Sequence, residues 1–368
     1  MKDERAHLQL FDLIAREWHL PSATTQVLFN ASNTAVAFGC ADGSIHLAST
    51  SDKSSPNQRT RRAVDTGRVT IAPRDGQVTP LRKADHTDGR SSIIGRHGQS
   101  NFIFAKDSGR INTLTPGGIS VHLPQRAATP VQAVAARPVG EIIAWASGNC
   151  VRVGTGIDDQ TLTHPAPIQA LAWSPDGSTL AVAHAAGVLL WAMTATPTAR
   201  DIALPAAPVA IVWSEDGKYL AVMLETDGFC LVTADSADAR HFGSFPAVVR
   251  SVGFNLARQT VLASGAYRPA AWSLTGWQNL ISGKSGLILI EAIAACPTRN
   301  LVAVGYANGL VSLAEIGQPT EILLRENTGA AIRDIAWSGC GNFLALAGAD
   351  GTAALVEFPE AMFKPTGE

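Results

Sequence analysis

Short apolar runs of about four to six residues, separated by turn-forming residues, make up most of the chain. Segment 167–191 has the clearest pattern. It alternates three apolar runs with two interruptions: 171–173, then Ser174-Pro-Asp-Gly, 180–183, then Ala186-Gly, and 188–191. Pro presets φ, Asp bonds to its own backbone and Gly accepts a positive φ, so both interruptions favour tight turns. Because the runs are too short for helices, the segment predicts three strands joined by two turns.

The same unit recurs along most of the chain, and the turn between its second and third strands marks each copy. Asn-Gly and Asp-Gly at this turn are the strongest hairpin signals, because such turns need a positive φ twice. From the second copy onward the copies are about forty residues apart, which is the length of a four-stranded propeller blade. The eight turns are Ala41-Asp42-Gly43, Asp107-Ser108-Gly109, Ser147-Gly148-Asn149, Ala185-Ala186-Gly187, Thr226-Asp227-Gly228, Ala266-Tyr267-Arg268, Ala307-Asn308-Gly309 and Ala349-Asp350-Gly351.

The sequence therefore predicts an all-β fold, a β-propeller of eight four-stranded blades. Seven blades are the alternative, if the hairpin near Asp107 merges with the segment before it. The last unit, which starts at Ile332, holds only three strands, whereas residues 16–23 resemble the outer-strand residues 199–206. We therefore expect residues 8–20 to supply the outermost strand of the last blade, which closes the ring and removes exposed sheet edges. Residues 1–358 then form one domain, followed by a tail at 359–368.

One interval in the repeat is irregular, because Gly43 and Gly109 are 66 residues apart. The excess lies in residues 51–88, which read as a long polar loop in which 69–72 can form a strand. This segment is rich in basic residues, among them Arg59, Arg61, Arg62, Arg68 and Arg74. One interpretation is a solvated insertion. The other is a partner-binding arm, since long loops are often functional.

Composition excludes several classes of protein. With 46% hydrophobic residues the chain can bury a large core, and its net charge of −2 gives no global attraction to nucleic acid or to anionic membranes. No apolar run approaches the roughly 18 residues of a membrane span. The charged residues 1–7 contain no apolar signal core, and the five cysteines are dispersed and odd in number. We therefore expect a cytoplasmic protein without a disulfide framework.

No catalytic or metal-binding motif stands out in the sequence. A Gly-x-Ser-x-Gly elbow and a Walker-type loop are absent, and the cysteines and nine histidines lack metal-ligand spacing. The expected first strands offer Glu291 to a central channel and little else. We therefore expect no cofactor, no metal site and no enzymatic activity.

Three stretches resemble the WD-repeat family of β-propellers: Ala172-Trp-Ser-Pro-Asp-Gly177, Trp213-Ser-Glu-Asp-Gly217 and Gly305-Tyr-Ala-Asn-Gly309. Segment 295–309 is similar to one in stand-alone WD-repeat proteins of alphaproteobacteria. The resemblance covers roughly residues 24–50 and 100–358, although the Gly-His pair that the family places before a first strand is absent. It implies a non-catalytic scaffold for protein–protein or protein–peptide interaction. The alternative is an enzyme or small-ligand sensor with its site in the central channel.

The turns between second and third strands should share one face, which is the expected partner face. Tyr and Arg are enriched where interfaces concentrate their binding energy, so Tyr267, Arg268 and Tyr306 are the leading candidates. The same face should also carry these residues: Asn308, Asp227, His184, Asp350 and Arg110. The alternative interpretation is ordinary turn polarity. On the opposite face, Asp176, Glu215, Asp216 and Lys218 are expected to be plain turn residues.

A Trp-Ser pair ends the expected first strand in three units, at Trp173, Trp213 and Trp337. Such rings are expected to pack between neighbouring blades, because burial explains most large aromatic side chains. The functional alternative is that a ring stacks on a ligand.

Overall fold

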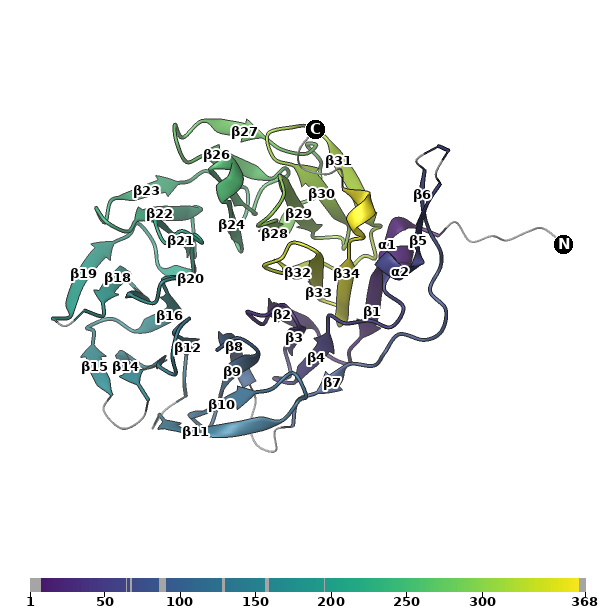
Figure 1. Ribbon diagram of the computed structural model, residues 1–368. Coiled ribbons are helices and arrows are strands. Elements are labelled where there is room, and N and C mark those ends of the chain that lie inside the picture. The colour runs from purple at the N-terminus through teal and green to yellow at the C-terminus, as the bar shows by residue number, and fades with distance from the viewer. Residues whose placement is uncertain are drawn as a thin grey trace.

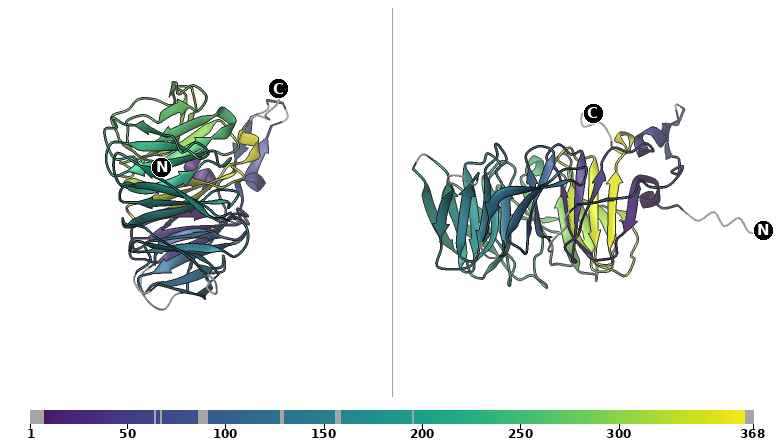
Figure 2. Two further views of the ribbon diagram at one scale, coloured as in Figure 1. Left: turned by 90° about the vertical axis from the view of Figure 1, so that its left-hand side faces the viewer. Right: turned by 90° about the horizontal axis from the view of Figure 1, so that it is seen from below.

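The computed structural model describes residues 8–63, 65–66, 68–85, 91–127, 130–155, 159–194 and 196–363. Within these ranges the strands form eight four-stranded antiparallel sheets and one two-stranded ribbon. The sheets are arranged radially around a centre (Figure 1), and the edge views show a disc (Figure 2). This confirms the propeller and its eight blades. The alternative of seven is wrong, because the hairpin at Asp107 lies within a blade of its own.

Each blade runs from an innermost to an outermost strand, and the blades are numbered here in chain order. Blade 1 consists of β2 (Thr24–Phe29), β3 (Ala35–Cys40), β4 (Ile45–Ser49) and β7 (Arg82–Lys83), and blade 2 of β8 (Ser91–His97), β9 (Asn101–Lys106), β10 (Arg110–Leu114) and β11 (Ser120–Arg126). Blade 3 consists of β12 (Ala133–Ala136), β13 (Ile143–Ser147), β14 (Cys150–Gly154) and β15 (Gln160–Thr163), and blade 4 of β16 (Ile168–Trp173), β17 (Thr179–His184), β18 (Gly187–Ala192) and β19 (Thr198–Ala203).

Blade 5 consists of β20 (Pro208–Trp213), β21 (Tyr219–Leu224), β22 (Phe229–Thr233) and β23 (Ala239–Phe242), and blade 6 of β24 (Val252–Asn255), β25 (Thr260–Ala263), β26 (Ala270–Ser273) and β27 (Asn279–Ile281). Blade 7 consists of β28 (Ile290–Ala295), β29 (Leu301–Tyr306), β30 (Val311–Glu315) and β31 (Glu321–Arg325), and blade 8 of β32 (Ile332–Trp337), β33 (Phe343–Gly348), β34 (Thr352–Glu357) and β1 (Ala15–His19). Two short 3₁₀ helices are also present, Leu256–Arg258 and Glu360–Met362.

The hydrophobic core lies between neighbouring blades. One cluster joins Val27 and Phe38 of blade 1 to Leu355 of blade 8, for example. Second strands such as β3 are buried along their whole length, whereas innermost strands such as β16 mix buried residues with partly exposed ones. A sheet that is packed on both faces reads as a continuous apolar run, so the burial explains the sequence pattern.

The N-terminal segment closes the ring, as the sequence predicted. Strand β1 pairs with β34 in antiparallel register, from Ala15 opposite Val356 to His19 opposite Thr352. A short helix that was not predicted, α1 (Leu10–Ile14), precedes β1 and buries two side chains, Phe11 and Ile14. The outermost strand of blade 8 therefore comes from the other end of the chain.

Two further contacts tie blade 8 to blade 1. The Arg16 guanidinium on β1 donates to the Ser49 carbonyl at 2.7 Å. The Asp334 carboxylate on β32 accepts the backbone N–H of Val27 at 2.8 Å. Burial raises the pKa of Asp334 to about 7, against the opposing effect of its two backbone hydrogen bonds.

The irregular interval forms an arm that stands off the disc. It contains α2 (Pro56–Arg59) and a two-stranded ribbon of β5 (Thr60–Arg62) and β6 (Val69–Ile71). The prediction of a polar loop over 51–88 is wrong at Arg82 and Lys83, because these two residues form β7, the outermost strand of blade 1. Residues 86–88 lie outside the described ranges. None of the helices in the described part of the chain is long and apolar enough to cross a membrane.

Candidate functional site

The disc has two faces with different loops. We call the upper face the one that carries the turns between second and third strands and the loops that join successive blades. The lower face carries the turns between first and second and between third and fourth strands. The residues predicted for the partner face all lie at the upper turns, but they are spread around the ring from Arg110 in blade 2 to Asp350 in blade 8. Only Tyr267 with Arg268, and Tyr306 with Asn308, share a turn.

Tyr306 does not offer its ring to a partner. Its side chain is only 7% exposed and packs in the core between blades 6 and 7. The hydroxyl donates to Glu321 Oε1 at 3.0 Å, and burial raises the pKa of Tyr306 to about 12. The expectation that Tyr306 contributes to the partner face with Tyr267 is therefore wrong. Its partner sits on β31, the outermost strand, and no local sequence pattern indicates that contact.

His184 is also buried, at 2% exposure, and belongs to a hydrogen-bonded group of three side chains. Its Nε2 lies 2.9 Å from Asp201 Oδ1, and His164 Nε2 lies 3.3 Å from Asp201 Oδ2. The centroids of the two imidazole rings are 3.9 Å apart, and the ring planes are tilted by 34°. Burial alone would raise the pKa of Asp201, but the hydrogen bonds from both rings outweigh it and lower the pKa.

Two histidines and a carboxylate can in principle hold a metal ion, and their ligand atoms lie within 4.8 Å of one another. Their hydrogen bonds indicate another role. Backbone N–H groups of Ala166 and Ala186 donate to Nδ1 of His164 and His184, at 3.1 and 3.3 Å. Because Nδ1 accepts, Nε2 is the nitrogen of each ring that donates a hydrogen bond to the Asp201 carboxylate. This arrangement ties the loop that follows β15 and the end of β17 to β19, the outermost strand of blade 4, and no spacing in the sequence indicates it.

Three of the predicted polar residues accept backbone hydrogen bonds. The amide oxygen of Asn308 accepts the N–H of Leu310, and the carboxylate of Asp350 accepts that of Thr352, each within its own turn. The carboxylate of Asp227 accepts the N–H of Ser244, in the loop that follows β23. These bonds fit the interpretation as ordinary turn polarity.

Around Tyr267 the upper face is apolar and exposed. The Tyr267 side chain is 44% exposed, and its carbonyl accepts the Gly286 N–H at 3.1 Å. This bond brings the loop between β27 and β28 next to the Tyr267 turn, and in that loop Leu287 is 96% and Ile288 36% exposed. Val248, 40% exposed, lies in the preceding loop between blades, close to Gly265. We call these four residues, Val248, Tyr267, Leu287 and Ile288, the upper apolar patch.

Charged residues line the mouth of the central channel next to this patch. In β28 and β32 a register shift leaves one extra residue near the start of the innermost strand, Glu291 and Arg333. Glu291 Oε2 lies 3.0 Å from Arg250 Nε and 3.9 Å from Arg333 Nη1. Both arginines are about half exposed, whereas Glu291 is largely buried. The sequence singled out Glu291 but missed its two partners on the neighbouring blades.

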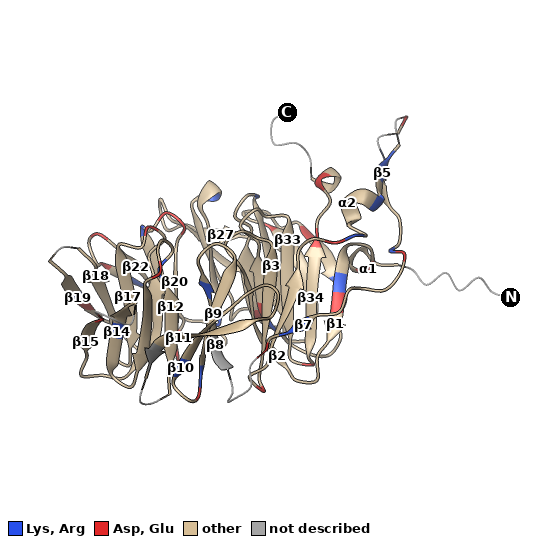
Figure 3. Ribbon diagram, turned by 60° about the horizontal axis from the view of Figure 1, so that its bottom comes forward, with Lys and Arg blue, Asp and Glu red and all other residues tan. Residues whose placement is uncertain are grey.

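The basic residues of the arm divide into two groups. Arg59 donates to the carbonyls of Ser54 and of Leu13 in α1, so it ties the arm to the disc. Arg74 bonds at 3.1 Å to the buried carboxylate of Asp52 at the base of the arm, which also lies 3.7 Å from Arg16 on β1. The other three lie exposed along the ribbon, which Figure 3 shows projecting from the disc: Arg61, Arg62 and Arg68.

Comparison with known proteins agrees with this architecture. Two family models match the chain: the anaphase-promoting complex subunit 4 WD40 domain over residues 288–363, and the WD domain, G-beta repeat, over residues 158–191. Together with the eight four-stranded blades, these two partial matches support a WD-repeat β-propeller family for this chain. The relation to alphaproteobacterial members stays a prediction.

Among solved structures, the Dos1 propeller is similar in fold. It superposes with a TM-score of 0.67 at 12% sequence identity, and the alignment covers 95% of this chain and 96% of that one. No protein with curated annotation matches the sequence.

Proposed function

We propose that the chain is a non-catalytic scaffold that binds a protein or peptide partner through the upper apolar patch. The observation that carries this proposal is the exposure of Leu287, at 96%, in a loop that backbone hydrogen bonds hold beside Tyr267. Grouped exposed apolar side chains are a feature of interaction surfaces, and a pre-ordered loop loses little entropy on binding.

The surroundings of the patch support a partner that combines apolar and acidic residues. Arg250 and Arg333 share the single carboxylate of Glu291, and Arg268 and Lys284 lie in the loops of the patch itself. The rim is therefore net positive. A catalytic role in the channel, the alternative function, gains no support from Glu291, whose carboxylate is already paired with two arginines. We also retain a cytoplasmic location as a prediction; all five cysteines are free thiols.

Site-specific crosslinking tests this proposal. A photoreactive amino acid replaces Leu287 in one variant and Val139 in a matched control, whose side chain is 72% exposed on the lower face. We expect a crosslinked partner from position 287 alone. Tyr267→Ser with Ile288→Ser should abolish the crosslink without changing the melting temperature, because both side chains are exposed. Equal capture from both positions, or capture that survives the double substitution, would remove the patch from consideration.

The exposed ribbon is the competing interaction surface. Arg61, Arg62 and Arg68 can attract an acidic partner, and such binding weakens with added salt because exposed charges are screened. Replacing all three by Ala in the same crosslinking assay separates the two surfaces: loss of capture here, with the patch intact, would favour the ribbon.

A further inference from the structure

Three innermost strands end in the same motif on the lower face. Trp173, Trp213 and Trp337 each donate their indole N–H to a carbonyl of the preceding blade, at 3.3, 3.1 and 3.0 Å. This confirms the predicted packing between blades. The turn that follows each strand contains a glycine with φ near +70°, namely Gly177, Gly217 and Gly341. The three sites thus offer a direct internal comparison.

In the groove between blades 3 and 4, an arginine of the chain itself occupies the site. Arg137 Nε donates to the Gly177 carbonyl at 2.7 Å, and the guanidinium carbon lies 5.7 Å from the centroid of the Trp173 ring. The arginine stem also packs against the Cα of Gly177, where a Cβ would collide with it. Trp173 is accordingly only 7% exposed.

The groove between blades 7 and 8 is filled in a similar way. Arg299 donates to the Gly341 carbonyl and, at 3.0 Å, to the Asn342 side chain. Phe358 stacks on the Trp337 ring with centroids 5.2 Å apart, so that Trp337 is 6% exposed. Two of the three sites therefore place a guanidinium on the turn glycine of the next blade, although their arginines come from different positions in the sequence.

The groove between blades 4 and 5 lacks such an occupant. Within the described part of the chain no guanidinium lies over the Trp213 ring, and the only atom near a Cβ built on Gly217 is Pro175 Cδ. Trp213 remains partly exposed, unlike the other two rings. The groove has a volume of about 740 Å³.

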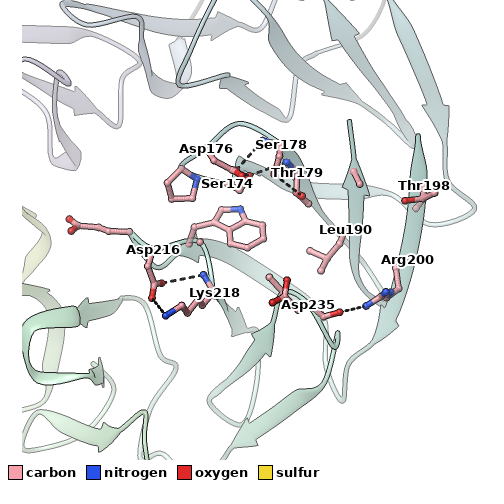
Figure 4. A pocket seen from close by; sticks show the side chains of 17 residues that line it. Ser174, Asp176, Ser178, Thr179, Leu190, Thr198, Arg200, Asp216, Lys218 and Asp235 are labelled. Atoms are coloured by element: carbon pink, nitrogen blue, oxygen red, sulfur yellow. Dashed lines mark hydrogen bonds and ion pairs between the residues drawn. The ribbon is translucent and has the colours of Figure 1, made fainter. Parts of the chain in front are cut away.

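The open groove is also acidic. Four carboxylates and two cations are among its described lining residues: Asp176, Glu215, Asp216, Asp235, Arg200 and Lys218. Figure 4 shows Asp176 on one wall and Asp216 and Asp235 on the other. Each cation already has a partner within the groove: Arg200 donates to the Asp235 carbonyl at 2.9 Å, and Lys218 lies 3.5 Å from Asp216. The four carboxylates outnumber the two cations, so the lining is net negative. The charge of the groove therefore complements a cation.

We propose that the groove between blades 4 and 5 binds an arginine side chain of a partner peptide. The guanidinium would donate to the Gly217 carbonyl and lie against the Trp213 ring, as Arg137 does at Gly177 and Trp173. Aromatic rings and carboxylates favour arginine, because its planar cation stacks and donates in several directions at once. The site lies on the lower face and is independent of the upper apolar patch, so either proposal can fail without the other.

Indole NMR tests this site directly. The probe is the peptide acetyl-Ala-Ala-Arg-Ala-Ala-amide, and its control carries citrulline, a neutral isostere, in place of arginine. The Trp213 indole signal is assigned by its loss in Trp213→Phe. We expect the arginine peptide to shift this signal saturably, with no shift of the Trp173 and Trp337 signals, whose rings are covered. The citrulline peptide should bind at least tenfold more weakly.

Two variants on exposed positions distinguish the groove from unspecific attraction. Ala199→Arg places a guanidinium at the edge of the groove from the exposed strand β19, and should weaken peptide binding at least tenfold. Glu326→Gln removes an exposed carboxylate on the upper face and should leave binding unchanged. Absence of a saturable Trp213 shift up to about 10 mM peptide would overturn the proposal, because the dissociation constant would then lie above the millimolar range. Equal binding of the citrulline peptide, or an unchanged affinity in Ala199→Arg, would overturn it as well.

Discussion

Removing the closing segment, residues 1–20, should take away a large part of the free energy of unfolding of the protein. Deletion of residues 1–20 takes away all five register pairs between β1 and β34, the Arg16 bond to Ser49, and the buried Phe11 and Ile14 side chains. Burial of two such side chains alone contributes about 3–6 kcal/mol. Typical domains are stable by only about 5–15 kcal/mol, so the truncated chain should lose its cooperative melt and associate through the edge of β34.

Calorimetry and light scattering measure both effects, and a peptide of residues 8–20 provides the sharper assay. Added to the truncated protein, this peptide should restore the transition in a concentration-dependent manner, because it binds only the folded ring. The same peptide with Phe11→Ala and Ile14→Ala should restore little, since the pairing strand is kept but the buried side chains are lost. An unchanged melting curve for the truncation, or equal rescue by both peptides, would refute this account of ring closure.

Further outcomes follow from individual side chains. The stability of the protein relative to Asp334→Asn should fall by up to about 4 kcal/mol as pH rises from 4 to 7, because the folded carboxyl, with a pKa of about 7, keeps a proton that the unfolded chain has released; urea unfolding at each pH measures the difference, and a constant difference would contradict it. Tyr306→Ala should cost about 3–5 kcal/mol in the same assay, as expected for a buried aromatic residue. Arg74→Ala should cost about 1.5–3 kcal/mol, because the buried Asp52 carboxylate loses its closest cation but keeps Arg16 at 3.7 Å and the Ser54 N–H. Arg61→Ala should stay within about 0.5 kcal/mol because that side chain is exposed.

Features specified by local sequence were predictable. Turn chemistry at Ser174-Pro-Asp-Gly and at Asp107-Ser-Gly located strands that the structure pairs in separate blades. The closing strand followed from the internal similarity of residues 16–23 to residues 199–206, which compares the chain only with itself. Helix α1 escaped prediction because five residues give too short a pattern to distinguish a helical turn from a strand.

Contacts between elements far apart in the sequence could not be predicted in the same way. The sequence does not indicate the hydrogen bond of Tyr306, because its partner Glu321 belongs to another strand. It does not indicate the ion pairs of Glu291 either, because Arg250 and Arg333 lie on neighbouring blades. The open groove beside Trp213 is likewise defined only by comparison with sites that Arg137 and Arg299 fill. Such differences arise from the way neighbouring blades meet, and they leave no periodic signal.

Ring closure also sets the order of events during synthesis. Strand β1 leaves the ribosome before any blade exists, while His19 and its partner Thr352 are 333 residues apart. At about 5–20 residues per second, β1 waits roughly 17–67 seconds for β34. Throughout that time the nascent chain displays Phe11 and Ile14 without a binding surface, and a second copy made nearby offers the same edge of β34. Strand exchange between copies therefore competes with closure, and its yield should rise with the density of ribosomes on one message.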